Sequence, residues 1–369
     1  MIKILFFIET LKAGGAEKVM IDLVNHMDQT KFDITVQTVW PCDAKKFLVP
    51  GIRYKSMYNA ENKATHLRYR AEAESGLAYR LHIKDDYDIE CAYIEMGPTK
   101  VMSASTNQKA KKLAWVHCDL LKKIEDLGTF VSKSGKQYRQ YDEVICVAET
   151  VRDSFRKLFG DNPPSRVLYN VFDDDGIRQK ARVPLEIPKD VTRPIVAAIG
   201  RLSKEKGYDR LLRVSRRLLN DGIEHEVWLI GDGPEKARLE RYVADNQMAD
   251  SVRFLGFQAN PYPYLTAADI GVCSSHFEGF STFAVECMIL GKPFVTTECS
   301  GMRELLGDSE FGLITEMTED ALFSGLKTML QNESLRSQYA AKAALRGRNF
   351  SMVQLVKATE DYFMKLAGK

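Results

Sequence analysis

The sequence predicts an α/β protein made of two doubly wound domains that face a central cleft. Short apolar runs rich in Val, Ile and Phe alternate with amphipathic stretches, a pattern typical of parallel sheets covered by helices on both faces. The alternation stops in one polar stretch, residues 173–190, and starts again from Pro194. A chain of 369 residues, 45% of them apolar, is also long enough to bury two separate cores. Ligands of such folds bind at the carboxyl ends of the strands, so the chemistry is expected there.

Six apolar runs in the first half are predicted to form the strands of the first sheet, with helices between them. They are Ile2–Ile8, Ile34–Trp40, Ile89–Ile94, Lys112–Val116, Val144–Val147 and Arg166–Tyr169. The stretch Asp173–Asp190 contains an acidic run, two prolines and little periodicity, so we expect a linker there. The first domain is therefore predicted to span residues 1–183.

Five further apolar runs are predicted to form a second sheet in residues 184–350. They are Ile195–Ile199, Glu226–Ile230, Val252–Phe254, Ile270–Cys273 and Pro293–Thr296, separated by helical patterns such as Asp209–Leu219 and Pro234–Asp245. Three polar helices are expected from about Glu319 to the end of the chain.

Composition narrows the class of protein. A net charge of +2 gives no overall field that would attract nucleic acid, so we expect no nucleic-acid partner. The apolar run Ile2–Ile8 is too short for a signal peptide, and no stretch approaches the roughly 18 apolar residues of a membrane-spanning helix. Seven cysteines without C-x-x-C spacing indicate buried free thiols in a reducing compartment. We therefore expect a cytoplasmic protein.

The densest chemical signal is the segment His276–Glu286, which follows a predicted strand and opens a helix. A turn at this junction exposes backbone N–H groups, and the helix dipole adds to their attraction for an anion, so a diphosphate is the expected ligand. Glu278 and Glu286 place two carboxylates beside this site, where they can accept hydrogen bonds from the hydroxyl groups of a sugar and a ribose. The expected amide donors are Gly279, Phe280, Ser281 and Thr282.

Two other interpretations of these glutamates stay open. Taken alone, Glu278 would be a solvated loop residue and Glu286 a partner of the helix dipole. Two carboxylates about 5 Å apart would also suit a glycoside hydrolase. A simple hydrolase, however, does not need the adjacent anion site.

A second loop, Gly200–Gly207, follows the strand Ile195–Ile199 and carries two cations. Arg201 and Lys206 can neutralise a diphosphate there without a metal ion. Fixed cations also stabilise the charge that develops on a departing phosphate. We therefore expect no metal or other cofactor.

Glycines mark two more turns after strands. Gly231 and Gly233 would allow a planar base to approach the backbone closely, although a G-x-G turn has many structural uses. Gly14 and Gly15 open the first predicted helix and form another turn suited to an anion. A third glycine is missing there, and no acidic residue ends the second strand, which disfavours an NAD enzyme.

One histidine and one acidic run complete the candidates. His117 follows the strand Lys112–Val116, with Asp119 close by, so it is expected at the functional edge of the first sheet. The run Asp173–Asp175 lies in the predicted linker without partners at metal-ligand spacing, and we interpret it as a solvated turn.

Taken together, these segments resemble glycosyltransferase family four, as found in bacterial enzymes of surface-polysaccharide synthesis. The match runs in the right order along the whole chain, through Gly14–Gly15, Trp115–His117, Gly200–Gly207, Gly231–Gly233 and Glu278–Glu286. The resemblance implies the GT-B fold, in which two Rossmann-like domains flank the active site. It also implies that the C-terminal helix, residues 351–369, packs on the first domain.

The resemblance also implies roles for the residues. Arg201 and Lys206 would bind the donor diphosphate, Glu286 the ribose, and Glu278 the donor sugar. His117 would act beside the reacting sugar. Gly14 and Gly15 would border the acceptor and the donor phosphate. Members of the family retain the anomeric configuration, usually without a metal.

The resulting hypothesis is transfer of a hexose or N-acetylhexosamine from a UDP-sugar, with a GDP-sugar second, to a growing glycan or a lipid-linked acceptor. Among the rivals, a nucleotide-sugar epimerase would convert the donor without an acceptor, and a phosphorylase would need inorganic phosphate. A non-catalytic nucleotide- or glycan-binding subunit would bind without turnover.

Two segments of the first domain interleave basic residues with aromatic or apolar ones, His66–Arg70 and Leu120–Ile124. Such a surface suits peripheral contact with anionic lipid. A solvated helix face explains the same pattern equally well.

Overall fold

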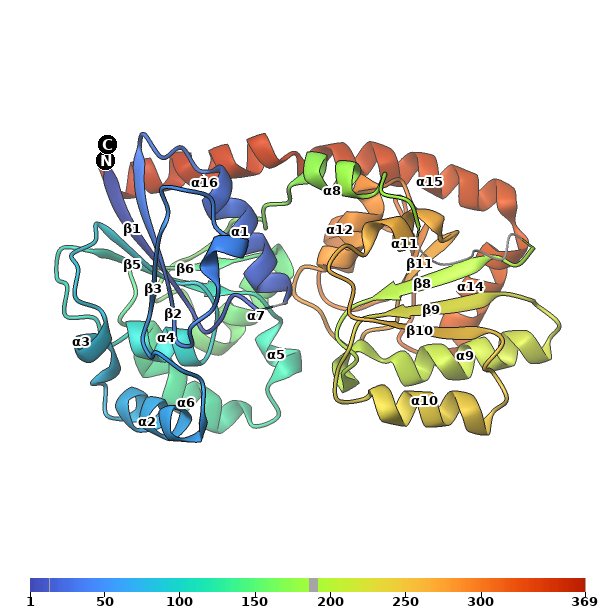
Figure 1. Ribbon diagram of the computed structural model, residues 1–369, viewed down its shortest axis with the longest axis horizontal. Coiled ribbons are helices and arrows are strands. Elements are labelled where there is room, and N and C mark those ends of the chain that lie inside the picture. The colour runs from blue at the N-terminus through green and yellow to red at the C-terminus, as the bar shows by residue number, and fades with distance from the viewer. Residues whose placement is uncertain (13, 186–191, 369) are drawn as a thin grey trace. The chain divides into compact units, whose positions relative to one another are not determined.

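The chain folds into two compact units in the computed structural model, which describes residues 1–12, 14–185 and 192–368. The first unit comprises Met1–Phe172 together with Met352–Lys369, and the second comprises Asp173–Ser351. In each unit helices flank a central sheet (Figure 1). Two doubly wound α/β units are therefore present, as the sequence predicts.

A seven-stranded parallel sheet, in the order β3-β2-β1-β4-β5-β6-β7, forms the centre of the first unit. Its strands are β1 (Ile2–Ile8), β2 (Phe32–Thr38), β3 (Arg53–Ser56), β4 (Ile89–Ala92), β5 (Lys111–Val116), β6 (Glu143–Cys146) and β7 (Ser165–Val167). Its helices are α1 (Gly15–His26), α2 (Lys63–Glu74), α3 (Ala78–His82), α4 (Gly97–Met102), α5 (Leu120–Lys123), α6 (Leu127–Tyr138), α7 (Glu149–Phe159) and α16 (Met352–Leu366), with a 3-10 turn at Ala44–Lys46.

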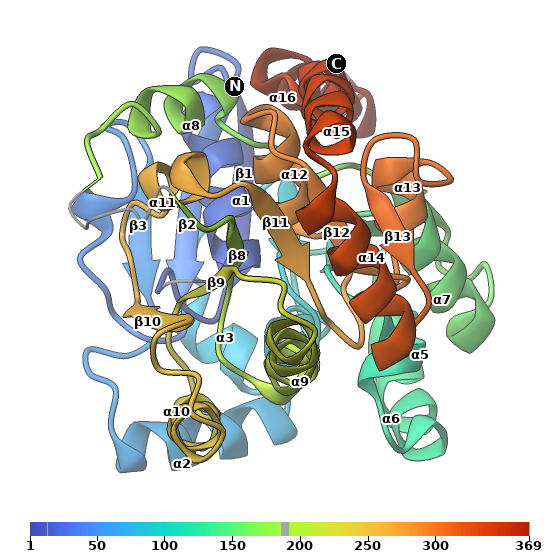
Figure 2. The same ribbon diagram turned by 90° about the vertical axis from the view of Figure 1, so that its right-hand side faces the viewer.

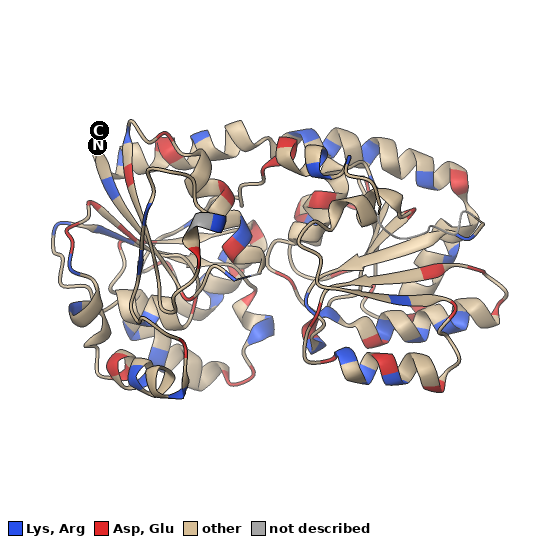
Figure 3. Cartoon of the chain, viewed as in Figure 1, with Lys and Arg blue, Asp and Glu red and all other residues tan. Residues whose placement is uncertain are grey.

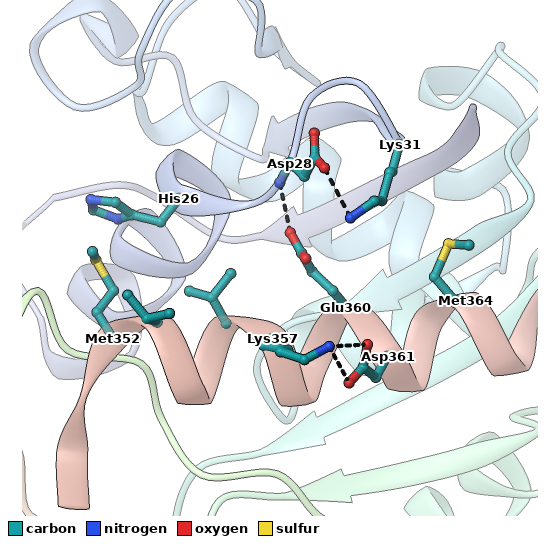
Figure 4. Close-up of a pocket in the computed structure, with 10 residues that line it drawn as sticks. His26, Asp28, Lys31, Met352, Lys357, Glu360, Asp361 and Met364 are labelled. Carbon is teal, nitrogen blue, oxygen red and sulfur yellow. Dashed lines mark hydrogen bonds and ion pairs between the residues drawn. The ribbon is translucent and has the colours of Figure 1, made fainter.

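Helix α16 belongs to the core of the first unit although it ends the chain. Its Phe363 is fully buried and meets the ring edges of Phe6, Phe32 and Trp115 at centroid distances of 6.1, 6.4 and 6.2 Å. The Glu360 carboxylate also accepts a hydrogen bond from the backbone N–H that follows α1 (Figure 4). Aromatic burial of this size fixes the helix on the sheet.

A six-stranded parallel sheet, in the order β10-β9-β8-β11-β12-β13, forms the centre of the second unit. Its strands are β8 (Ile195–Ile199), β9 (Glu226–Ile230), β10 (Val252–Gly256), β11 (Ile270–Cys273), β12 (Phe294–Thr297) and β13 (Leu313–Thr315). Its helices are α8 (Asp174–Lys180), α9 (Tyr208–Asn220), α10 (Lys236–Asp245), α11 (Tyr262–Ala267), α12 (Thr282–Ile289), α13 (Met302–Leu306), α14 (Glu319–Gln331) and α15 (Glu333–Gly347), with 3-10 turns at Lys204–Lys206 and Arg348–Phe350.

Alternate residues of β8 feed two separate apolar cores, as the two-residue period of a strand requires. Val196 and Ala198 pack with residues of α9, α10 and α14, whereas Ile195 and Ala197 pack with Trp228 and residues of α11. Figure 2 shows α9 and α14 beside one another on their face of this sheet. Both faces of the sheet are therefore buried.

The boundary between the units lies earlier than the predicted one, after residue 172 rather than 183. The predicted linker begins instead with α8, whose Arg178 guanidinium donates to the Ile289 carbonyl in the second unit. The interpretation of Asp173–Asp175 as a solvated turn is also wrong, because these residues begin α8. Asp173 is the N-cap of α8, and its carboxylate accepts a hydrogen bond from the Gly176 N–H at 2.9 Å. Asp174 and Asp175 lie in the first turn of the helix, where the positive end of the helix dipole stabilises their negative charges. Residues 186–190 of the predicted linker lie outside the described residues.

The predicted strands coincide with observed strands to within two residues at each end, but two observed strands escape the sequence pattern. Both β3 and β13 lie at an edge of their sheet and are only partly buried. An edge strand with a short or polar sequence lacks the apolar run by which buried strands are recognised.

Charged residues are spread over both units, and the cysteines form no disulfide. Acidic and basic residues are interspersed along the helices and loops (Figure 3). All seven cysteines are free; five are buried, whereas Cys42 and Cys118 are partly exposed. Every helix in the described part of the chain is too short or too polar to cross a bilayer.

Candidate functional site

Three loops of the second unit leave the carboxyl ends of adjacent strands. Strands β9, β8 and β11 are neighbours in the sheet and run in parallel, so residues 231–235, 200–207 and 274–281 emerge at the same edge. The structure thereby brings together the three second-half motifs that the sequence predicts to bind a donor.

Glycines allow the first two loops to touch backbone to backbone. Gly231 has φ +145°, and a Cβ there would lie 1.9 Å from the Gly200 carbonyl oxygen. A Cβ on Gly233 would lie 2.4 Å from the Leu202 carbonyl oxygen. The Leu202 N–H donates to the Asp232 carbonyl at 2.9 Å, which joins the loops directly. Loop packing therefore requires glycine at positions 231 and 233, whether or not a nucleotide base also lies against them.

A third glycine fastens the Arg201 loop to the loop after β11. Gly207 has φ +60°, and a Cβ would lie 2.2 Å from the Ser274 carbonyl oxygen. The Ser274 hydroxyl donates to the Lys206 carbonyl at 3.0 Å, and the His276 N–H donates to the Glu205 carbonyl at 2.8 Å. Two backbone–backbone contacts and one hydrogen bond from a serine hydroxyl thus hold Lys206 against the segment that carries Glu278.

Lys206 and Glu278 form an ion pair, with Nζ at 2.8 and 3.0 Å from the two carboxylate oxygens. The Ser275 hydroxyl donates to the same carboxylate at 2.6 Å. Burial lowers the pKa of Lys206, but the attraction of Glu278 outweighs it and raises that pKa to about 12. The lysine is therefore a permanent cation, and only 11% of the glutamate side chain is exposed.

Arg201 is a cation of this edge that is open to solvent. Its side chain is exposed, and no side-chain hydrogen bond or ion pair joins it to the described residues. An unpaired guanidinium five residues before the Lys206–Glu278 pair is available to an anion, to which it offers two parallel N–H donors.

Helix α12 begins at this edge with a serine cap. Ser281 is the N-cap, and its hydroxyl accepts from the Ala284 N–H at 3.4 Å. Phe280 and Ser281 are buried, while Thr282 is partly exposed. The Gly279 carbonyl lies 2.4 Å from where a Cβ on Gly301 would be, so Gly301, which the sequence pattern does not single out, shapes this turn.

The side chain of Glu286, on helix α12, is buried. It is 6% exposed, and its carboxylate accepts from the Tyr262 hydroxyl of α11 at 3.2 Å. A buried carboxylate is costly unless it is hydrogen-bonded, so the sequence must provide this partner. The interpretation of Glu286 as a mere dipole partner does not account for that arrangement.

In the first unit, His117 follows β5, and its ring packs on Tyr93 at a centroid distance of 5.1 Å. The side chain is half-buried, but its Nε2 atom is fully buried and finds no hydrogen-bond partner in the described chain. Burial lowers the pKa of His117 to about 4 although the nearby Glu95 raises it. The imidazole is therefore neutral near pH 7, with one ring nitrogen unsatisfied.

Glu95 fixes the His117 loop, and sequence reasoning missed it. This buried carboxylate accepts the His117 backbone N–H at 3.0 Å, the Cys118 thiol at 3.0 Å and the Lys123 ammonium at 2.9 Å. Burial raises the pKa of Glu95, but Lys123 and these donors outweigh it and lower that pKa to about 2. The available signal was a glutamate between the end of a buried strand and the Gly97–Pro98 helix start.

The Gly14–Gly15 turn opens α1 as predicted, but a side chain of the protein already covers it. Gly14 is the N-cap, and a Cβ there would lie 2.1 Å from the Glu17 carboxylate. Burial raises the pKa of Glu17, and the carboxylates of Glu9 and Glu95 raise it further. The turn therefore presents a carboxylate beside its backbone donors.

Comparison with known proteins gives related sequences and folds. Residues 179–346 match the family model of glycosyl transferases group 1. An N-acetylgalactosamine-N,N'-diacetylbacillosaminyl-diphospho-undecaprenol 4-alpha-N-acetylgalactosaminyltransferase of Campylobacter jejuni is 35% identical over 200 residues, or 54% of this chain and 53% of that protein, so the match spans about half the length of this relative. The lipopolysaccharide core biosynthesis glycosyltransferase LpsD of Rhizobium meliloti is 28% identical over 359 residues, 96% of both chains.

Two solved structures share the fold over nearly the whole chain. HepE of Anabaena, in complex with UDP and glucose, has a TM-score of 0.78 at 19% identity and covers 99% of this chain and 100% of its own. Sucrose-phosphate synthase of Thermosynechococcus elongatus has a TM-score of 0.83 at 18% identity, with 99% of both chains covered. The two-unit architecture is thus that of GT-B proteins.

The contact between Gly207 and Ser274 predicts a specific loss of stability. Gly207→Ala should cost about 1–3 kcal/mol more than Gly222→Ala in free energy of unfolding, measured by urea denaturation. Gly222 is the matched control because it has φ +75° with no atom within 4 Å of its Cβ position. Gly222→Ala should therefore lose stability only through the strain of a left-handed backbone at alanine. Equal costs in the two variants would contradict the proposed loop contact.

The lowered pKa of His117 predicts a pH-dependent stability. The unfolded chain takes up the proton below about pH 6.5, whereas the folded chain resists it until about pH 4. The melting temperature should therefore fall as the pH drops through this window, and it should fall less in a His117→Gln variant. Identical pH profiles for the two proteins would show that the imidazole is not held neutral.

Proposed function

We propose that this chain, a glycosyltransferase of the GT-B fold whose residues 179–346 belong to glycosyl transferases group 1, transfers a hexose or N-acetylhexosamine from a nucleotide diphosphate sugar to a glycan or lipid-linked acceptor. The observation that carries the proposal is the edge of the second sheet, where exposed Arg201, the Lys206–Glu278 pair and the start of α12 emerge from adjacent strands. An exposed guanidinium and an ammonium that Glu278 partly compensates, beside a helix N-terminus, suit a diphosphate.

A UDP-sugar is our first choice of donor and a GDP-sugar the second. HepE, which shares the fold, was solved with UDP and glucose, and the Campylobacter relative is named for transfer of N-acetylgalactosamine to a diphospho-undecaprenol carrier. These names support a UDP donor and a glycan carried by lipid. On the same support we propose action in the cytoplasm, at the inner face of the membrane, with peripheral contact through basic residues of the first unit.

The four charged site residues of the second unit are proposed to bind the donor. Arg201 and Lys206 neutralise the diphosphate and stabilise the charge that it gains as the sugar leaves. Glu278, held by Lys206, accepts hydrogen bonds from the donor sugar, and Glu286 accepts those of the ribose. Because the chain supplies these cations itself, we propose that no metal ion is required and that the anomeric configuration is retained.

His117 is the proposed contribution of the first unit to sugar recognition. Its neutral imidazole has a buried, unsatisfied Nε2, which is a ready partner for a sugar hydroxyl. A group that is left unsatisfied at a cost in stability is expected where a ligand supplies the missing bond.

Turnover of a nucleotide sugar tests the function directly. Purified protein should release UDP from at least one UDP-sugar, faster with a membrane glycolipid extract as acceptor than without it, and to the same extent in EDTA. NMR of the donor during the assay separates the rivals, since an epimerase would produce a new nucleotide sugar and no free UDP. If no UDP- or GDP-sugar is bound or turned over, the proposal is wrong.

Substitutions at the edge of the second sheet test the assignment of residues. Arg201→Ala and Lys206→Met should each lower kcat for UDP release by about 100-fold or more, as loss of one preorganised charge stabiliser does. Glu286→Gln should mainly raise the KM for donor, by about tenfold. Lys204→Ala is the matched control because this exposed lysine of the same loop should leave both constants within about twofold of wild type. Wild-type kinetics in Arg201→Ala and Lys206→Met would contradict the site.

A further inference from the structure

A buried arginine of α9 contacts the loop that carries Glu278. Arg210 lies in the first turn of α9 and is 6% exposed. Its Nη2 atom lies 2.6 Å from Nδ1 of His276, two residues before Glu278. Its Nη1 atom is fully buried and has no hydrogen-bond partner in the described chain. Within the described residues, this guanidinium therefore binds an imidazole and forms no ion pair.

The nearby carboxylates are bound by a different arginine. Burial lowers the pKa of Arg210, although the carboxylates of Asp209 and Glu319 raise it. Both carboxylates accept hydrogen bonds from Arg213, at 3.0 Å to Asp209 and 2.6 Å to Glu319. Because an arginine side chain does not lose its proton in a protein, Arg210 stays a buried cation.

A buried cation of this kind lowers the stability of the fold. Removal of a charge from water costs free energy, and a single hydrogen bond to an imidazole offsets little of it. The other buried residues of α9 are apolar, aromatic or small: Tyr208, Leu211, Leu212, Val214, Ser215 and Leu218. Groups that are kept at a cost in stability are common at functional sites. The hydrogen bond to His276 is therefore the expected reason for the presence of Arg210.

This hydrogen bond fixes the tautomer of His276. A guanidinium has donors only, so Nδ1 of the imidazole must accept and the ring proton must lie on Nε2. A doubly protonated ring would have no acceptor and would place a second positive charge beside Arg210. Partial burial lowers the pKa of His276, and the charge of Arg210 lowers it further. The contact therefore exists only while the imidazole is neutral.

His276 is a fixed point of the chain just before Glu278. Its backbone N–H donates to the Glu205 carbonyl at 2.8 Å, and the hydroxyl of the preceding Ser275 donates to the Glu278 carboxylate at 2.6 Å. The side chain of His276 is exposed, so packing alone does not hold the ring. Within the described chain, Arg210 supplies the hydrogen bond that holds it. Arg210 thereby ties α9, which begins directly after Gly207, to the loop that carries Glu278.

We propose that Arg210 is a positioning residue for sugar transfer, which holds His276 and through it keeps the Glu278 carboxylate in place for the donor sugar. The proposal rests on the proposed glycosyltransferase function and adds to it a residue outside the donor-binding set. Arg210 contacts neither the donor nor the reacting atoms and acts only through the loop from Ser275 to Glu278.

Histidine NMR tests the contact without any substrate. In long-range ¹H–¹⁵N spectra, the His276 signals, assigned by their loss in His276→Asn, should show the Nε2–H tautomer and a pKa below the ordinary 6.5. In Arg210→Met this pKa should rise, because the neighbouring positive charge is gone. The other titratable or charged groups around the pair are the same in both proteins: Asp209, Arg213, Glu319, Glu205, Glu278 and Cys299. An Nδ1–H tautomer in the wild type, or an equal pKa in Arg210→Met, would overturn the contact.

Turnover of the UDP-sugar that the donor assay identifies tests the positioning role. Arg210→Met should lower kcat for UDP release about 10-fold, since Glu278 loses its place beside the sugar. The Kd for UDP alone should stay within about twofold, because UDP carries no sugar for Glu278 to bind. Arg216→Met is the matched control, since it makes the same change at a partly exposed residue of α9 and should leave kcat within about twofold.

Two variants of His276 separate loss of the hydrogen bond from loss of the ring. His276→Phe keeps a ring without an acceptor and should lower kcat as much as Arg210→Met. His276→Asn should lose far less, because its Oδ1 can accept the guanidinium N–H in place of Nδ1. In the wild type, kcat should fall as the pH drops through the pKa of His276, and this fall should be smaller in His276→Asn, which has no ring to protonate.

A stability measurement separates positioning from a purely structural role. Arg210→Met removes a buried cation without a charged partner, so it should keep or raise the melting temperature while it lowers kcat. A wild type that turns over no nucleotide sugar refutes the proposed function, and this role with it. With an active wild type, the positioning role alone is overturned if Arg210→Met keeps the wild-type kcat, if it loses melting temperature together with kcat, or if His276→Asn loses as much kcat as His276→Phe.

Discussion

The ion pair between Lys206 and Glu278 is the interaction on which the proposed donor site depends. The two residues are 72 positions apart and meet only because β8 and β11 are neighbours in one parallel sheet. Two backbone–backbone contacts and the Ser274 hydroxyl hold their loops together around Gly207, and the Ser275 hydroxyl donates a further hydrogen bond to the Glu278 carboxylate. With Glu278 compensated in this way, the pair contributes a fixed dipole rather than a free charge, and the exposed Arg201 supplies the net positive charge that attracts an anion.

The first unit also contains a buried Lys–Glu ion pair next to a site residue. Glu95 and Lys123 neutralise one another under the His117 loop, and the thiol of Cys118 and the His117 N–H satisfy the remaining oxygen positions. The loop is thereby rigid, while the imidazole that it presents is neutral and incompletely bonded. Arg201 in the second unit and His117 in the first thus each lie beside a buried, mutually paired Lys–Glu set.

Much of this could be predicted from the sequence, because buried parallel strands are continuous apolar runs and the motif residues follow them directly. That reasoning located the strands and placed Arg201, Lys206 and Glu278 at one edge. It could not give the strand order, so it treated Lys206 as a free cation and missed its pairing with Glu278. Glu95 and Tyr262 escaped for a similar reason, since a carboxylate or hydroxyl is important here only through a partner that the fold supplies. The short edge strands and α8 were missed because their sequences carry weak or polar patterns.

We propose that Arg201 and Lys206 act on a single pyrophosphate at the amino end of α12. A crystal structure of the protein with UDP measures this most directly. We expect the β-phosphate to lie within hydrogen-bonding distance of both the Arg201 guanidinium and the Lys206 ammonium, with the ribose hydroxyls hydrogen-bonded to Glu286. A UDP molecule bound elsewhere, or phosphates that contact neither cation, would contradict it.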